Sequence, residues 1–168
     1  MASIAGILSL NGHDTDGETR QLAEMLERMH HRGPDNTVVC TLRDGRGALG
    51  ANEINLTPER TRCTAIERPP YILFDGELYN ERSPGQTDVE LFKAYYEKWG
   101  KRCFSQLDGS YACAVVDEDE VVLARDQVGA RPHFYGRENG SMSFSTEMKG
   151  LVDHIRFDVK ELPPGHLF

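Results

Sequence analysis

The chain begins with Met1-Ala-Ser-Ile-Ala-Gly-Ile-Leu-Ser-Leu10, a short apolar run without helical spacing. Asn11-Gly12 follows and signals a turn, so the run predicts a buried strand. Chain termini fray unless they are tied down, and a strand that starts at residue 2 therefore places this end inside the fold. A buried α-amine can activate a nucleophilic first side chain. Ala2 offers no nucleophile, and this absence governs the interpretation of the rest of the chain.

Composition sets the broad class. The 168 residues suffice for one domain with a core, and 27% charged and 39% hydrophobic residues are typical of a globular protein. A net charge of −8 argues against nucleic acid or an anionic membrane as the main partner. The four cysteines lack C-x-x-C spacing, so we expect neither a metal site nor a cofactor. No membrane span or secretion signal is evident, which predicts a cytoplasmic protein.

Hydrophobic periodicity predicts the order of elements. Helices are expected over residues 18–30 and 88–99, the second starting at the capping box Thr87-Asp-Val-Glu90. Strands are expected before, between and after them, and residues 57–70 read as a loop. The strands cover residues 37–42, 48–56, 71–74, 110–116, 120–125, 133–135 and 141–145. This order predicts an α+β fold, and residues 1–168 form a single domain.

Two polar segments contain candidate functional residues. Asp75-Gly-Glu-Leu-Tyr-Asn80 follows a strand and reads as a turn, where functional groups often lie. Asp75 and Glu77 are an acid–base pair on one interpretation and hydrogen-bonding turn residues on the other. His30 and His31 are metal or acid–base candidates, although cationic residues are also typical of a helix C-terminus.

Eight short motifs carry a resemblance over nearly the whole chain. They resemble the class II glutamine amidotransferase domain of the asparagine synthetase family. In order, they are Ser3-Ile-Ala-Gly-Ile7, His31-Arg-Gly-Pro-Asp35, Asp75-Gly-Glu-Leu-Tyr-Asn80, Thr87-Asp88, Leu107-Asp-Gly109, Ala124-Arg-Asp126 with Gly129 and Pro132, Ser145-Thr-Glu-Met-Lys149, and Leu162-Pro-Pro-Gly165. The resemblance implies the N-terminal-nucleophile hydrolase fold, two packed antiparallel sheets with helix layers (αββα). We expect both helices to cover one side, and no synthetase (ATP-pyrophosphatase) domain within residues 1–168.

The resemblance also implies site residues, and three of them differ from the family. The family's nucleophile is a cysteine after the initiator methionine, and Ala2 occupies that position. Asp75 stands where an asparagine contributes to the oxyanion hole. Glu53 stands where an arginine binds the substrate carboxylate, unless Arg60 or Arg62 reaches back to do so. Loss of the nucleophile removes the reaction, and an oxyanion-hole donor is worth roughly 10²–10³ in rate.

Other positions match the family. Asp88 corresponds to the aspartate that binds the substrate amine, and Gly76, Glu77 and Asn80 are retained. We expect Glu53, Asp75 and Asp88 to face one cleft, with Glu77 near by. Crowded carboxylates take up a proton or recruit a cation, which favours a small amine or a hard divalent cation over glutamine. The alternative is a cleft closed by side chains.

Three functional hypotheses follow. The first is a pseudoenzyme with a degenerate active site: a binding or regulatory module, or the partner of a separate synthetase subunit, with a small amine or amino acid as its ligand. The second is a glutamine-hydrolysing, ammonia-releasing amidotransferase in which an engineered substitution has replaced the cysteine by Ala2. The third uses Ser3 as the nucleophile, which requires removal of two residues.

Overall fold

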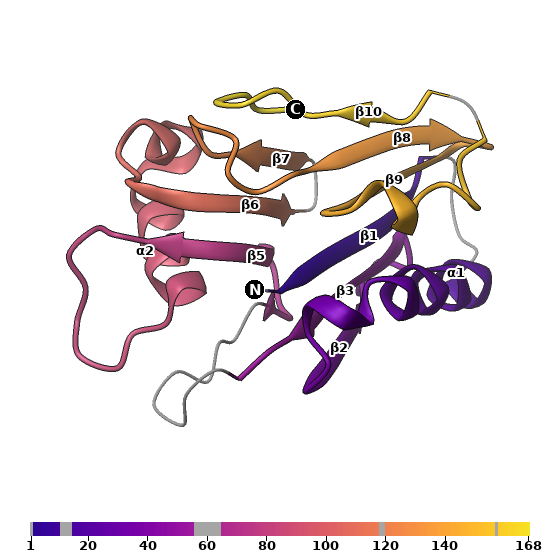
Figure 1. The fold of residues 1–168 in the computed structure, drawn as a ribbon, viewed down its shortest axis with the longest axis horizontal. Coiled ribbons are helices and arrows are strands. Elements are labelled where there is room, and N and C mark those ends of the chain that lie inside the picture. Colours follow the sequence, from indigo (N-terminus) through magenta and orange to yellow (C-terminus); the bar gives the residue numbers. More distant parts are fainter. Residues whose placement is uncertain (1, 11–14, 56–64, 118–119, 157) are drawn as a thin grey trace.

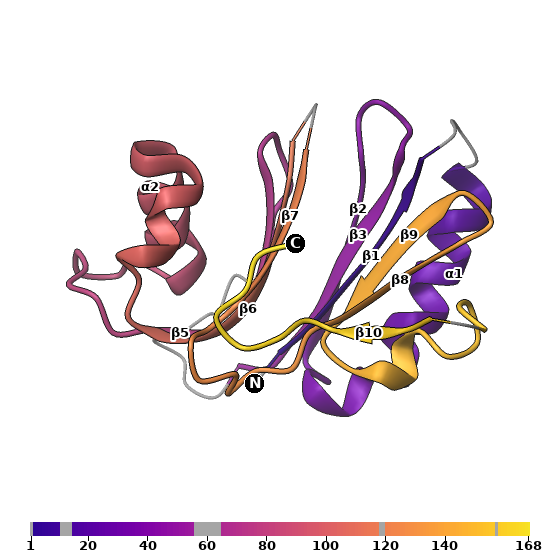
Figure 2. The ribbon, with the colours of Figure 1, turned by 90° about the horizontal axis from the view of Figure 1, so that it is seen from above.

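Two antiparallel sheets pack face to face in the computed structural model, which describes residues 2–10, 15–55, 65–117, 120–156 and 158–168. Every pairing between two of the strands that the structure describes is antiparallel. Figure 2 shows the two sheets as adjacent layers, with α1 outside one and α2 outside the other. This arrangement confirms the predicted αββα architecture.

The larger sheet has the strand order β10-β8-β9-β1-β3-β2. Its strands are β1 Ser3–Ser9, β2 Asn36–Thr41, β3 Gly47–Glu53, β8 Phe134–Glu138, β9 Ser141–Ser145 and β10 Lys160–Glu161. The opening apolar run is the central strand, because Ala5 pairs with Gly50 on one side and with Ser145 on the other. The prediction that the start of the chain is buried is therefore confirmed.

The smaller sheet has the order β4-β5-β6-β7, with β4 Ala65–Ile66, β5 Tyr71–Leu78, β6 Gly109–Val116 and β7 Val121–Arg125. β5 continues through Asp75 to Leu78, so the predicted turn after residue 74 is wrong. The ladder continues because Gly76 pairs with Tyr111 of β6. The short β4 likewise lies where only a loop was expected.

The helices α1 (Thr15–Arg28) and α2 (Asp88–Trp99) cover opposite outer faces, which corrects the expectation that both lie on one side. Leu22, Met25 and Leu26 of α1 pack against Ala5 of the larger sheet. Phe92 of α2 packs against the smaller sheet, and separate apolar side chains fill the space between the sheets. Each sheet has an apolar outer face that needs a cover, and one helix supplies each cover.

Short helical turns complete the fold near the start of β1. α1 begins three residues earlier and ends two residues earlier than the predicted helix over residues 18–30, and a 3₁₀ turn over His30–Arg32 follows it. Two further 3₁₀ turns are Gly100–Ser105 and Met148–Gly150. The first and third turns bring charged side chains to the beginning of β1. In the part of the chain that the structure describes, no helix combines the length and the apolar character needed to span a membrane.

Candidate functional site

Ala2 is fixed at both of its backbone polar atoms. Its N–H donates to Oδ1 of Asp75 at 3.1 Å, and its carbonyl oxygen accepts from Nε of Arg32 at 2.8 Å. Only 4% of Ala2 is exposed. Figure 1 places this end of the chain beside β5, the strand that carries Asp75. The structure therefore brings together two of the residues predicted for the site, Ala2 and Asp75.

Arg32 connects these residues to a third segment. Its Nη2 donates to Oδ2 of Asp75 at 2.9 Å, and its Nη1 donates to Oε1 of Glu147 at 3.2 Å. The Arg32 side chain is 11% exposed and that of Asp75 is 1% exposed. One guanidinium thus binds two carboxylates and one carbonyl oxygen, a hydrogen-bonded arrangement that a buried ion pair needs to be stable.

Burial dominates the electrostatics of Asp75. Desolvation raises the pKa of this carboxyl, while the Arg32 and Arg131 guanidinium groups and the Ala2 N–H act in the opposite direction. Glu147 behaves differently. Desolvation opposes its ionisation, but hydrogen bonds from Lys149 and Arg32 outweigh it and lower the pKa of Glu147. Two carboxylates, Asp75 and Glu147, therefore lie near the start of β1 together with the cationic side chains of Arg32 and Lys149.

Glu53 and Asp88 have their own partners. Glu53 is buried at the end of β3, and its Oε2 accepts from Nδ2 of Asn36 at 2.9 Å. Asp88 begins α2, and its Oδ1 accepts from the Leu78 N–H and from Nη2 of Arg82, each at 2.8 Å. Local cations and donors therefore compensate the excess of negative charge expected from the sequence.

Two of the retained residues, Gly76 and Asn80, have a role in the backbone structure. Gly76 has φ +156°, and a Cβ there would lie 2.1 Å from the Ser110 carbonyl oxygen. Asn80 donates to the Gln106 carbonyl at 2.9 Å and accepts from the Asp108 N–H at 2.8 Å, which joins the end of β5 to the approach to β6. Glu77 follows Gly76 in β5 and is half-buried.

Alternative site residues can be placed only in part. Arg60 and Arg62, the alternative carboxylate ligands, lie outside the described residues. Ser3, the alternative nucleophile, is fully buried and accepts a hydrogen bond from Nδ2 of Asn52 at 3.0 Å. Within the described ranges, no three His, Cys, Asp or Glu side chains are grouped in the way that would hold a metal ion.

Sequence reasoning missed the part played by Arg32 and Glu147. Both belong to motifs quoted for the resemblance, but they are separated by 115 positions, and no periodic signal indicates that they meet. Arg131 was missed for the same reason. Arg131 lies between Gly129 and Pro132 of a quoted motif, and only the fold brings its charge close enough to Asp75 to affect the pKa of that carboxyl.

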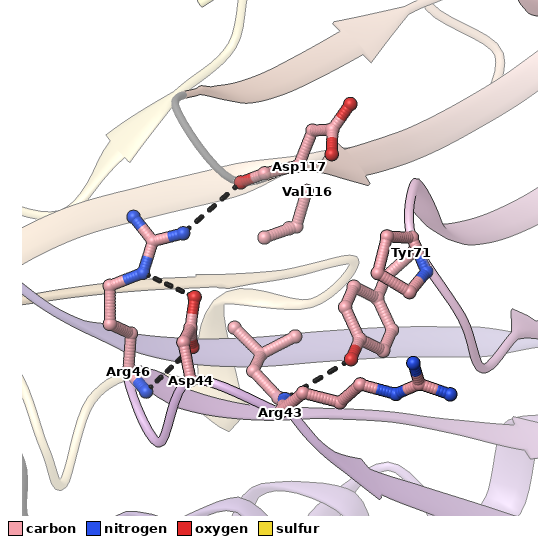
Figure 3. Close-up of a pocket in the computed structure, with 8 residues that line it drawn as sticks. Arg43, Asp44, Arg46, Tyr71, Val116 and Asp117 are labelled. Atoms are coloured by element: carbon pink, nitrogen blue, oxygen red, sulfur yellow. Dashed lines mark hydrogen bonds and ion pairs between the residues drawn. The ribbon is translucent and has the colours of Figure 1, made fainter.

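A separate pocket of about 150 Å³ lies between the ends of the two sheets (Figure 3). Its lining residues are Leu42, Arg43, Asp44, Arg46, Pro69, Tyr71, Val116 and Asp117. Arg43 donates its backbone N–H to the Tyr71 hydroxyl at 3.1 Å, and Arg46 pairs with Asp44 at 2.6 Å. The turn over residues 42–46 adjoins Leu8 at the far end of β1, about 20 Å from Ala2 at ~3.3 Å per residue. This pocket contains none of the predicted site residues.

Two antiparallel sheets between helix layers, with the first strand starting beside an Asp-Gly pair, define the class II amidotransferase type of N-terminal-nucleophile hydrolase fold. The chain belongs to the glutamine amidotransferase domain family, which matches residues 1–165, and it is a domain of the asparagine synthetase type.

Relatives of known name support this assignment. The chain is 30% identical to a glutamine-hydrolyzing asparagine synthetase of Sandersonia aurantiaca, an alignment that covers 98% of this chain and 34% of the relative. It is also 30% identical to the glutamine-hydrolyzing asparagine synthetase 3 of Bacillus subtilis, over 82% of this chain and 25% of the relative. The chain therefore spans a quarter to a third of the length of these relatives.

Two solved structures share the fold. A glutamine phosphoribosylpyrophosphate amidotransferase from B. subtilis, complexed with ADP and GMP, aligns with a TM-score of 0.71 and 17% identity over 98% of this chain and 46% of that one. A structure described as the allosteric regulatory enzyme of purine biosynthesis aligns with a TM-score of 0.73 and 19% identity over the same shares.

Proposed function

We propose that this domain is a non-catalytic member of its family, a pseudoenzyme that acts as a binding or regulatory module. The observation that carries the proposal is the environment of Ala2. A methyl group stands at the buried start of β1, and the adjacent Asp75 is already bound to the Ala2 N–H and to Arg32. This arrangement contains a hydrogen-bonded ion pair between Asp75 and Arg32 but no nucleophile that could attack an amide carbon.

The cysteines that the structure describes do not compensate for the missing nucleophile. Desolvation raises the pKa of Cys103 to about 12 and raises that of Cys113 well above its ordinary value. Burial, followed by the charge of Glu67, raises the pKa of Cys40 as well. Only a thiolate attacks an amide carbon effectively, and none of these thiols is ionised near neutral pH.

The oxyanion position also argues against hydrolysis. An oxyanion hole requires donors, and both oxygens of Asp75 already accept hydrogen bonds. An ionised carboxylate would repel the negative oxygen of a tetrahedral intermediate. Glu53 adds a like charge where the family offers a cation to the carboxylate of glutamine, so three separate requirements of the reaction are unmet.

Activity restored by substitution tests the proposal. Variants would be produced with residue 2 as the first residue, verified by intact mass, and assayed for ammonia release from glutamine. A2C alone should remain at background, and adding D75N should raise the rate by roughly 10²–10³. Adding E53R to these two substitutions should lower the KM for glutamine. A2S combined with D75N is the matched control for thiol chemistry. Steady glutamine turnover by the unaltered protein would contradict the proposal.

The second candidate function is glutamine hydrolysis with an engineered alanine at position 2. The retention of Gly76, Asn80 and Asp88 favours it, because each position matches the family. A2C alone separates the candidates, since substantial ammonia release by this single variant would support the hydrolase and exclude a degenerate site.

The proposed partner and ligand follow from the relatives and the charges. The relatives are named as glutamine-hydrolyzing asparagine synthetases, and a separate synthetase subunit is the proposed partner. A small amine or an amino acid is the proposed ligand, held by Asp88. Thermal-shift measurements with glutamine and ethylamine test this, because a ligand specific to the folded state raises the melting temperature. A D88N variant should lose the response.

A further inference from the structure

The pocket between the ends of the two sheets combines an apolar floor with a charged rim (Figure 3). Leu42, Tyr71 and Val116 line it, and all three are buried members of the core between the sheets. Its volume is about 150 Å³, and an apolar cavity of about that volume can hold benzene. The pocket therefore has room for the apolar part of a small ligand.

Both sheets hold the walls of this pocket in place. The turn between β2 and β3 is closed by two hydrogen bonds, from the Leu42 N–H to the Gly47 carbonyl at 2.9 Å and from the Gly45 N–H to the Leu42 carbonyl at 3.0 Å. Arg46 reaches from this turn to the smaller sheet, where its Nη2 donates to the Asp117 carbonyl at 3.3 Å. The pocket is therefore formed before a ligand binds, which lowers the entropy cost of binding.

Two charged residues at the rim, Asp44 and Arg46, bind each other. Arg46 donates to Asp44 from Nε at 2.6 Å and from its backbone N–H at 2.9 Å. Desolvation opposes ionisation of Asp44, but these hydrogen bonds outweigh it and lower the pKa of the carboxyl. The Asp117 carboxylate lies across the pocket from the Arg43 guanidinium (Figure 3). Arg43 is therefore the cation at the rim that is left for a ligand.

Arg43 and Tyr71 have unused hydrogen-bond donors. The Tyr71 hydroxyl accepts the Arg43 backbone N–H at 3.1 Å, and within the described ranges no acceptor binds the hydroxyl hydrogen. The Arg43 guanidinium likewise has no hydrogen bond or ion pair with a residue that the structure describes. Figure 3 shows this side chain extending away from the Asp44–Arg46 pair. An O–H donor and an uncompensated cation therefore line the same pocket.

We propose that this pocket is a binding site for a small monocarboxylate with a short apolar group. The carboxylate accepts hydrogen bonds from the Arg43 guanidinium and the Tyr71 hydroxyl, and the apolar group covers the buried floor. A guanidinium presents a planar pair of donors that matches the two oxygens of a carboxylate. A phosphate dianion fits less well, because the carboxylates of Asp44 and Asp117 also line the pocket. The site goes beyond the proposed function, since it lies at the far end of β1 from Ala2.

Titration of the ¹⁵N-labelled protein with isobutyrate at pH 7 and constant ionic strength tests the proposal. The amide resonances of Arg43, Val116 and Asp117 should shift in a saturable way. Because Arg43 is exposed and the ligand is small, the dissociation constant should be on the order of millimolar. Isobutyramide has the same shape without the charge and should bind at least about tenfold more weakly. Methyl phosphate should also bind more weakly than isobutyrate.

Variants assign the binding to particular donors. R43M should weaken isobutyrate binding at least about tenfold, whereas R43K keeps the charge and should lose less. Y71F removes a neutral donor and should weaken binding several-fold. R68M is the matched control, because Arg68 is also exposed but does not line the pocket, and it should bind isobutyrate as the unaltered protein does.

Three results would overturn the inference. The first is equal affinity for isobutyrate and isobutyramide in the unaltered protein, which requires no variant to fold. The second is an R43M affinity no weaker than that of R68M. The third is the absence of saturable shifts up to about 50 mM isobutyrate, well above a millimolar dissociation constant. Ammonia release by A2C would overturn the proposed function and leave these titrations unchanged, so the two failures are distinguishable.

Discussion

Replacing Arg32 with methionine should destabilise the fold by about 3–4 kcal/mol at pH 7, because it removes the cation that is hydrogen-bonded to the buried carboxylate of Asp75. Removing one partner of a buried pair typically costs about 3–5 kcal/mol. Proton uptake sets a limit, since protonating a carboxyl of ordinary pKa at pH 7 requires about 4 kcal/mol at ~1.36 kcal/mol per pKa unit. For a domain of this size the loss corresponds to a fall of roughly 6–15 °C in melting temperature.

The pH dependence of this loss follows from the sign of the shift. Desolvation already raises the pKa of Asp75, and removing Arg32 raises it further. The variant should therefore be nearly as stable as the unaltered protein below the unfolded-state pKa near ~4, and should fall behind as pH rises through the raised folded-state value. Chemical denaturation at pH 4.5, 5.5 and 7 measures the difference.

Two controls sharpen this test. R82M removes a more exposed ion pair, with 32% and 17% exposure for Arg82 and Asp88, and should cost no more than about 1 kcal/mol. Adding D75N to R32M should recover more than half of the loss, because the neutral amide needs no cation. The reasoning would be refuted by an R32M loss no greater than that of R82M, or by a loss that increases as pH falls.

Three further predictions concern separate groups. The pKa of Glu147 is lowered in the folded state, so its ionised carboxyl stabilises the fold above the unfolded-state pKa and loses this effect as the pH falls through the folded-state pKa. E147Q should therefore flatten the acid limb of a profile of melting temperature against pH, and an unchanged limb would contradict this. T87A should destabilise α2 by about 1 kcal/mol in urea denaturation because it removes the capping box, whereas T87S should retain the cap; equal losses in the two variants would refute the assignment. Burial lowers the pKa of His133 to about 4, so its ring resonances should not titrate between pH 7.5 and 5.5 in NMR spectra, and a midpoint near 6.5 would show that the ring is hydrated.

Local sequence signals predicted the individual helices and strands better than they predicted how these elements pair and pack. The capping box at Thr87 and Glu90 and the helix over residues 88–99 are confirmed, because their determinants lie within one turn of chain. The predicted end of β5 was wrong because its last residues are held in the sheet by pairing with β6 and not by their own strand propensity. The side on which each helix lies depends on which sheet face is left uncovered, and this information is spread over the whole chain.

The same distinction applies to the candidate site. The resemblance identified Ala2 and Asp75 as equivalent to two catalytic positions, and the structure places them in contact. It did not indicate that Arg32 would neutralise Asp75, because a contact across 43 positions leaves no local pattern. The charge of the site was therefore predicted as strongly negative, whereas the structure compensates it with arginine side chains.

The central place of β1 has a consequence for synthesis on the ribosome. β1 is the first strand to be made, but β9, its neighbour on one side, follows β3, its neighbour on the other, by roughly 90 residues, or several seconds at ~5–20 residues per second. During that interval one edge of an apolar strand has no partner in its sheet. Unpaired edges of this kind are templates for aggregation, so the nascent chain should depend on chaperone protection until β9 has emerged.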